Sequence, residues 1–182
     1  MRELSLNILD IAENSLKANA TLITIDVLAK DNLLTIKISD NGSGMDSEFL
    51  SRVEDPFTTT RTTRKVGMGI PLMKMISEMS GGTFSVQSEK GKGTVVTSTY
   101  LIDHVDRPPL GDIAQTLISL IGNLNDCDLI FNFEAFDTQF RLNTQEVKEE
   151  LDGIPLDEPQ ILIFLRDMIN ENIKTNFRGV SL

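Results

Sequence analysis

Cysteine is nearly absent from this chain of 182 residues, because Cys127 is the only one. A single cysteine excludes an internal disulfide framework, and a hydrophobic content of 40% can build a core without such crosslinks. The sequence also lacks an N-terminal signal pattern and any apolar run long enough to span a membrane. These absences predict a soluble cytoplasmic protein with no membrane partner.

Positive charge is scarce in the second half of the chain. Residues 1–100 carry 11 Lys and Arg against 12 Asp and Glu, whereas residues 101–182 carry 6 against 15. Because an acidic surface repels phosphate backbones, we expect no nucleic-acid partner. A basic or neutral protein partner and a simple contribution to solubility explain this charge equally well.

Hydrophobic periodicity predicts a mixed α and β fold. Residues 4–18 repeat apolar side chains at helical spacing, and residues 21–40 alternate like the two strands of a hairpin. Residues 55–69 are too rich in threonine and charge for a core and predict a mobile flap. The later pattern predicts helices near 46–53, 70–79, 113–124, 144–151 and 159–174, and strands near 83–89, 94–102 and on either side of 135–137.

A change of composition at RPPLGD, residues 107–112, predicts a boundary in the chain. We therefore expect one domain over residues 1–103. Residues 104–182 would form a small acidic α+β region that either binds a partner or completes the fold.

Four features have the chemistry of a binding site: Asp10 with Asn14, the single residue Asp40, and two glycine-rich segments. Asp10 and Asn14 lie one helical turn apart, so that Asn14 could bind Mg²⁺ and Asp10 could orient an attacking group, although a solvated helix face has the same spacing. Asp40 shares the parity of the inward-facing residues of its strand, so its carboxylate is expected among the helices, where it needs a polar partner.

Two glycine-rich segments complete the pattern. In DNGSGM, Gly42 and Gly44 permit positive φ and close backbone approach directly after the predicted strand. In GMGIPL, Gly67 and Gly69 stand at the start of a predicted helix, where free N–H groups and the helix dipole favour phosphate oxygens. A simple turn is the alternative interpretation of this second pair.

The order and spacing of these motifs resemble the GHKL (Bergerat-fold) ATPase superfamily over roughly residues 4–100. DIAENSLKANATLITIDV and DNGSGM resemble the MutL N-terminal pattern, whereas DPFTTTR, GMGIPL and GKGT resemble the histidine-kinase pattern. The resemblance implies an α+β fold: a two-layer α/β sandwich, truncated at its N-terminus, followed by a small α+β C-terminal region. Either the C-terminal segments or a partner would fill the gap left by the missing leading strand.

The resemblance also implies an ATP and Mg²⁺ site. Asn14 would coordinate Mg²⁺, Lys17 would reach toward the phosphates, and Asp40 would accept a hydrogen bond from the adenine amino group. Gly44 would let the adenine lie against its loop, and Thr94 would support the Asp40 contact through water. The other implied cofactor contacts are Gly42, Met45, Phe57, Thr60, Arg61, Lys65, Gly67, Met68, Gly69 and Ile70.

Asp10 and Arg61 are the catalytic residues that the resemblance implies. Asp10 stands where MutL-like proteins and anti-sigma kinases carry a glutamate that activates the attacking group. Aspartate is one methylene shorter, a departure that could reposition this general base. Arg61 matches a basic residue that follows the paired threonines of related kinases, and Arg64 is a further candidate for contacting the terminal phosphate.

The implied function is an ATP-binding, histidine-kinase-like protein in signal transduction that phosphorylates a separate protein and could form a homodimer. The alternative is a non-catalytic switch in which ATP orders the flap and alters affinity for a partner. The acidic second half argues against a third reading, a MutL-like DNA-repair ATPase. His104, the only histidine, lies in HVDRPPL, which resembles a kinase acceptor box but also fits a linker.

Overall fold

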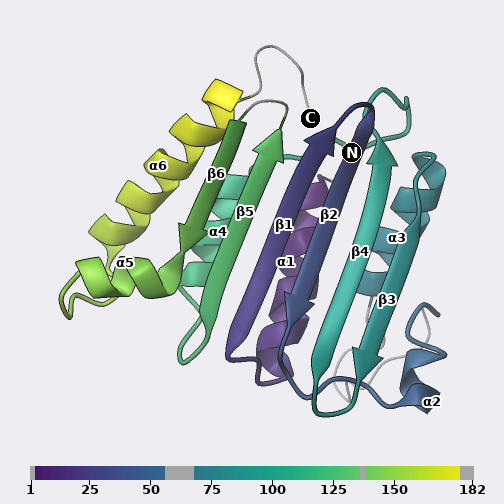
Figure 1. The fold of residues 1–182 in the computed structure, drawn as a ribbon, viewed down its shortest axis with the longest axis horizontal. Coiled ribbons are helices and arrows are strands. Elements are labelled where there is room, and N and C mark those ends of the chain that lie inside the picture. Colours follow the sequence, from purple (N-terminus) through teal and green to yellow (C-terminus); the bar gives the residue numbers. More distant parts are fainter. Residues whose placement is uncertain (1–2, 56–67, 136–137, 177–182) are drawn as a thin grey trace.

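A six-stranded mixed sheet forms the centre of the fold (Figure 1). The computed structural model describes residues 3–55, 68–135 and 138–176. The strands are β1 (Leu22–Lys30), β2 (Leu33–Asp40), β3 (Phe84–Glu89), β4 (Gly93–Leu101), β5 (Asp128–Ala135) and β6 (Thr138–Asn143). They lie in the order β3-β4-β2-β1-β5-β6, and β1 pairs in parallel with β5 while the other neighbours pair antiparallel.

Helices form a second layer on one face of this sheet. The longer helices are α1 (Leu4–Lys17), α3 (Gly69–Met79), α4 (Ile113–Ile121) and α6 (Pro159–Asn176), and the short ones are α2 (Ser47–Leu50) and α5 (Thr144–Glu150). In Figure 1, α1, α3 and α4 lie behind the sheet and α6 lies beside β6. This arrangement confirms the predicted two-layer α/β sandwich.

The core lies between the two layers because the strands alternate in burial. In β1, Ile23, Ile25 and Val27 are buried, whereas Asp26 between them is only half-buried. Such β-branched and apolar residues suit a pleated, half-covered surface, which explains why the hairpin at 21–40 was predictable. The hairpin is confirmed as β1 and β2, with Asp31 at positive φ in the turn.

The segments after Asp103 complete the same sheet. β5 pairs with β1 along its length, and β6 extends the sheet by one further strand. The chain between them and β4 returns to the first helix, where the Leu4 and Ser5 amides donate to the carbonyls of Pro109 and Leu110 at 3.0 and 2.8 Å. The C-terminal segments of this chain therefore occupy the position next to β1.

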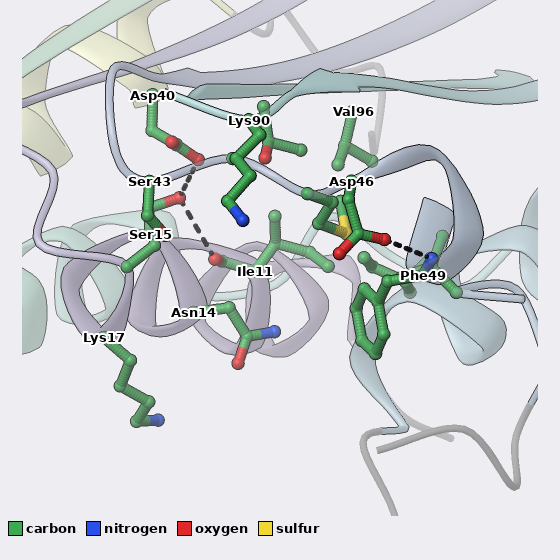
Figure 2. A pocket seen from close by; sticks show the side chains of 16 residues that line it. Ile11, Asn14, Ser15, Lys17, Asp40, Ser43, Asp46, Phe49, Lys90 and Val96 are labelled. Atoms are coloured by element: carbon green, nitrogen blue, oxygen red, sulfur yellow. Dashed lines mark hydrogen bonds between the residues drawn. The ribbon is translucent and has the colours of Figure 1, made fainter. Parts of the chain in front are cut away.

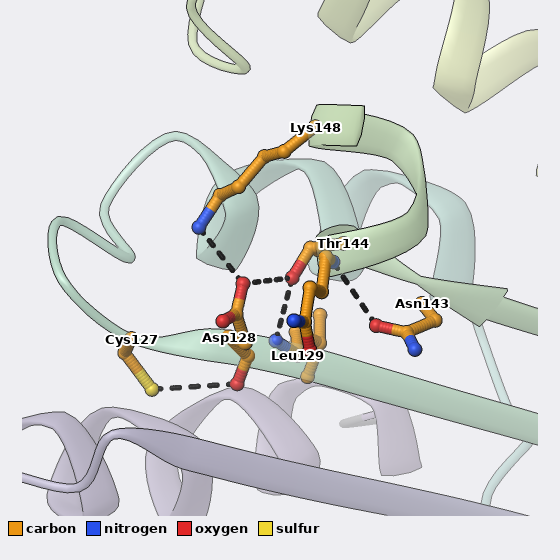
Figure 3. Close-up of polar contacts among 7 residues, drawn as sticks. Cys127, Asp128, Leu129, Asn143, Thr144 and Lys148 are labelled. Atoms are coloured by element: carbon orange, nitrogen blue, oxygen red, sulfur yellow. Dashed lines mark hydrogen bonds and ion pairs between the residues drawn. The ribbon is translucent and has the colours of Figure 1, made fainter. Parts of the chain in front are cut away.

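A buried hydroxyl attaches the last part of the chain to β5 (Figure 3). Thr144, the first residue of α5, accepts a hydrogen bond from the Leu129 amide at 2.8 Å and donates to Asp128 Oδ1 at 3.0 Å. Lys148, one turn along α5, contacts the same carboxylate oxygen at 2.8 Å. These contacts fix the start of β5 against α5.

At one end of the sheet, strands β1, β4 and β5 begin and strands β2, β3 and β6 terminate. The pairing register places Asp40 opposite Thr94, Ile23 opposite Asp40, and Leu22 opposite Asp128. The polar residues that follow or precede these strands consequently meet at one edge. In the described parts of the chain, no helix is both long and apolar enough to cross a membrane.

Candidate functional site

A pocket of about 560 Å³ lies between α1 and the end of the sheet where β2 terminates and β4 begins (Figure 2). Its volume is in the range of small-molecule and cofactor sites. One wall is the side of α1 that carries Ile11, Asn14 and Ser15, and the opposite wall is formed by Asp40 of β2 and Thr94 of β4. The site therefore lies where the predicted magnesium helix faces the predicted base-binding strand.

Two hydrogen bonds hold the carboxylate of Asp40 in the wall of this pocket. Ser15 Oγ donates to Asp40 Oδ2 at 2.7 Å, and the Gly42 amide donates to Asp40 Oδ1 at 2.9 Å. The predicted inward orientation is confirmed, because Ser15 belongs to α1 and is itself buried. A carboxylate has about four lone-pair sites, so after these two bonds it can still accept from a ligand.

Backbone contacts fix the loop that follows Asp40. Asn41 Oδ1 accepts from the Thr21 and Leu22 amides, both at 2.9 Å. Gly44 has a φ of 60°, and a Cβ there would lie 2.1 Å from the Glu89 carbonyl oxygen. Gly42 has no positive φ, but a Cβ there would lie 2.8 Å from the Ala18 carbonyl oxygen. Both glycines are thus required by close packing of the loop on its neighbours.

The start of α3 meets α1 beside Asp10 and Asn14. Gly69 is buried at the first position of α3, and a Cβ there would lie 3.2 Å from Asp10 Cβ and 3.7 Å from Asn14 Nδ2. A side chain at this position would be in tight contact with Asp10, so glycine eases the close approach of the two helices. The arrangement brings Asn14 and the positive end of a helix dipole to one side of the pocket.

Residues 1–103 match the family model described as histidine kinase-, DNA gyrase B-, and HSP90-like ATPase. The chain belongs to this family. The resemblance to GHKL ATPases is therefore confirmed, and the family's nucleotide is ATP. Among curated relatives, sporulation kinase D of Bacillus subtilis (strain 168) is 36% identical over 94 residues, which are 50% of this chain and 18% of that protein.

Another relative is a putative sensor protein of Shewanella frigidimarina (strain NCIMB 400), 31% identical over 107 residues, or 58% of this chain and 16% of that protein. The chain thus spans less than a fifth of either relative. A solved structure, the N-terminal domain of a DNA repair protein, matches with a TM-score of 0.51 at 16% identity, covering 79% of this chain and 52% of that one. That match concerns the fold alone.

Most of the predicted contacts in the described part of the chain line the pocket. They are Asn14, Lys17, Asp40, Gly44, Met45, Ile70 and Thr94. Gly42, Gly69, Met68 and Asp10 do not line it, although Gly42 binds the Asp40 carboxylate and Gly69 adjoins Asp10. The predicted contacts Phe57, Thr60, Arg61, Lys65 and Gly67, together with Arg64 and most of the predicted flap, lie outside the described residues.

Hydroxyl groups connect several of the lining residues. Ser88 Oγ accepts from the Met45 amide at 2.8 Å and lies 2.9 Å from Thr94 Oγ1. Lys17 borders the pocket and forms an ion pair of 2.9 Å with Glu13, one turn earlier on α1. The predicted role of Thr94 beside Asp40 is consistent with their cross-strand pairing.

Several lining residues were not predicted from the sequence. They are Ile11, Ser15, Ala18, Ser43, Asp46, Phe49, Val53, Lys90 and Val96. Ser15 carried a signal, since a hydroxyl continues the inward face of Ile8, Ile11 and Ala12 and could have been matched to the inward carboxylate. Lys90 carried none, because a lysine in a turn is ordinarily solvated.

Neither Cys127 nor His104 lines this pocket. Burial, with the nearby charge of Asp128, raises the pKa of the Cys127 thiol to about 11, so the group is neutral and a poor nucleophile at pH 7. His104 follows the far end of β4, and the strand from Thr94 to Leu101 spans about 23 Å. The pocket of one chain therefore does not face its own His104.

Proposed function

We propose that this chain binds Mg·ATP in the pocket between α1 and the sheet and acts as a histidine-kinase-like signalling protein that phosphorylates a separate cytoplasmic protein. The observation that carries the proposal is the Asp40 carboxylate, held by Ser15 and Gly42 in the wall of the pocket. A fixed acceptor in a half-buried position selects a ligand with a matching donor, such as the amino group of adenine.

The phosphates would extend toward the start of α3. Asn14 and Lys17 line this side of the pocket, and Gly69 places the helix dipole next to Asn14. A single amide oxygen is a weak magnesium ligand, so the ion would enter with the nucleotide, whose phosphate oxygens supply further ligands. Asp10, beside Gly69, and Arg61 are the proposed catalytic groups, and the acidic C-terminal region is the proposed partner-binding region.

A non-catalytic switch remains the second candidate function. Asp10 carries the shorter carboxylate at the proposed general-base position and does not line the pocket. In such a switch, ATP would change affinity for a protein partner without turnover. Labelled ATP with Mg²⁺ and candidate partners separates the two: phosphotransfer that is lost in Asn14→Ala supports the kinase, and background labelling with nucleotide-dependent partner binding supports the switch.

Titration calorimetry tests the binding proposal itself. Asp40→Asn should weaken both Mg·ATP and adenosine by about tenfold to a hundredfold, because it removes a charge-assisted hydrogen bond. Asn14→Ala should weaken Mg·ATP and leave adenosine unchanged. Asp31→Asn, in the exposed β1–β2 turn, is the matched carboxylate control and should bind like the parent.

A parent chain that gives no heat with Mg·ATP would refute the proposed site. Equal affinity of Asp40→Asn and the parent would refute the assigned role of the carboxylate, provided that the two proteins have the same melting temperature.

A further inference from the structure

The turn between β3 and β4 places a cation in the pocket. Lys90 is one of the pocket-lining residues, and its ammonium points across the pocket toward α1 (Figure 2). The turn cannot move away easily, because the Gly91 amide donates to the Ser43 carbonyl at 2.7 Å and the backbone of Glu89 packs against Gly44. The lysine is therefore carried by the same structure that holds the loop after Asp40.

Neighbouring lysines have carboxylate partners. Lys92, two residues along the same turn, forms an ion pair of 2.8 Å with Glu89, and Lys17 pairs with Glu13. Within the described part of the chain, no ion pair or hydrogen bond involves the Lys90 ammonium. Its three N–H donors are thus available to a molecule that enters the pocket.

The position of the turn decides which part of a nucleotide this cation would meet. The turn packs on Ser43 and Gly44, directly after the carboxylate that we assign to the base. Asn14 and the start of α3, assigned to the phosphates, lie on the side of α1 and Gly69. Lys90 therefore belongs to the base end of the pocket.

We propose that Lys90 is a second base-binding residue, donating a hydrogen bond to an acceptor nitrogen of the adenine ring while Asp40 accepts from the amino group. This proposal rests on the proposed ATP site. Adenine presents an amino donor beside the ring acceptor N7, so a carboxylate and an ammonium together match one edge of the base. Neither Asp40 nor Lys90 alone has both a donor and an acceptor.

Affinities for adenosine and Mg·ATP test the assignment in the full chain. Lys90→Met should weaken both ligands by the same factor, about tenfold, because the lost contact lies on the part that they share. Lys90→Arg should recover most of the affinity, since it keeps the charge and the donors. Lys92→Met is the matched control from the same turn and should stay within about twofold of the parent.

Three outcomes would overturn the proposal. Lys90→Met could bind within twofold of the parent, which would make Lys90 a solvated turn residue. It could weaken Mg·ATP and leave adenosine unchanged, which would move the contact to the phosphates. A parent chain that binds neither ligand would refute the proposed ATP site, and this contact with it, whereas the first two results refute the Lys90 assignment alone.

Discussion

At the scale of single residues, the pocket depends on a carboxylate whose position is fixed before any ligand arrives. Ser15 lies 3.4 Å from the Ile11 carbonyl and 2.7 Å from Asp40, and its one hydroxyl proton favours the shorter contact. The Gly42 amide holds the other carboxylate oxygen. Such preorganisation lowers the entropic cost of binding, because the side chain loses little freedom when the ligand enters.

A comparison of two glycines next to the pocket distinguishes the energetic cost of backbone strain from that of a steric clash. Gly44 and Gly91 both have positive φ, but a Cβ at Gly44 would lie 2.1 Å from the Glu89 carbonyl oxygen, whereas a Cβ at Gly91 would have no atom within 4 Å. Gly91→Ala should lower the free energy of unfolding by about 1 kcal/mol, and Gly44→Ala by at least about 3 kcal/mol. Urea unfolding measures both, and equal losses would contradict the packing argument.

At the scale of secondary-structure elements, the start of α3 and the start of α5 depend on different chemistry. α3 begins at a buried glycine that lets it approach α1, and that approach creates one side of the pocket. α5 begins at Thr144, whose hydroxyl fully satisfies a buried amide of β5. The contact of Gly69 with α1 therefore shapes the pocket, whereas the contact of Thr144 with Leu129 stabilises β5.

Thr144→Val should destabilise the chain without a change in side-chain shape. The substitution leaves the Leu129 amide unsatisfied in a buried position and removes a donor to Asp128, so we expect a loss of about 2 kcal/mol in the free energy of unfolding. Thr144→Ser keeps the hydroxyl and should lose much less. If thermal or urea unfolding ranks the two variants in the opposite order, the hydrogen bond is not what stabilises this junction.

At the scale of the whole molecule, the family match ends at residue 103, but the sheet includes two strands, β5 and β6, that come after this residue. β5 pairs with β1 from Leu22 to Ala29, and α4 packs against α1. Residues 104–182 thus cover one edge of β1 and part of the helix that carries Asn14. Sheet edges and apolar faces left without partners favour aggregation.

A chain cut after Asp103 should therefore lose cooperative folding. The fragment 1–103 should show no sharp thermal transition by circular dichroism and should aggregate, because β1 would lose β5 and α1 would lose α4. Mixing it with the fragment 104–182 should restore the transition. Cooperative unfolding of soluble 1–103 by itself would instead favour the independent domain that the composition predicts.

The sequence by itself determined which segments form the helices and strands around the site and which polar side chains face it. Helical spacing in α1, alternation in β1 and β2, and the parity of Asp40 are local properties, so they were readable from residue types a few positions apart. The family motifs likewise identified Asn14, Asp40, Gly44 and Thr94, which line the pocket together. Short-range pattern is sufficient for such inferences because the backbone period alone assigns each side chain to a face.

Only the tertiary structure decided how distant segments meet. No local pattern states that β5 pairs with β1, that Ser15 contacts a carboxylate 25 residues away, or that the turn carrying Lys90 packs on the loop after Asp40. These contacts depend on the order of strands in the sheet and on the approach of helices to it, and both are set by packing of the complete core. The composition of the pocket is therefore a property of the folded chain rather than of its motifs.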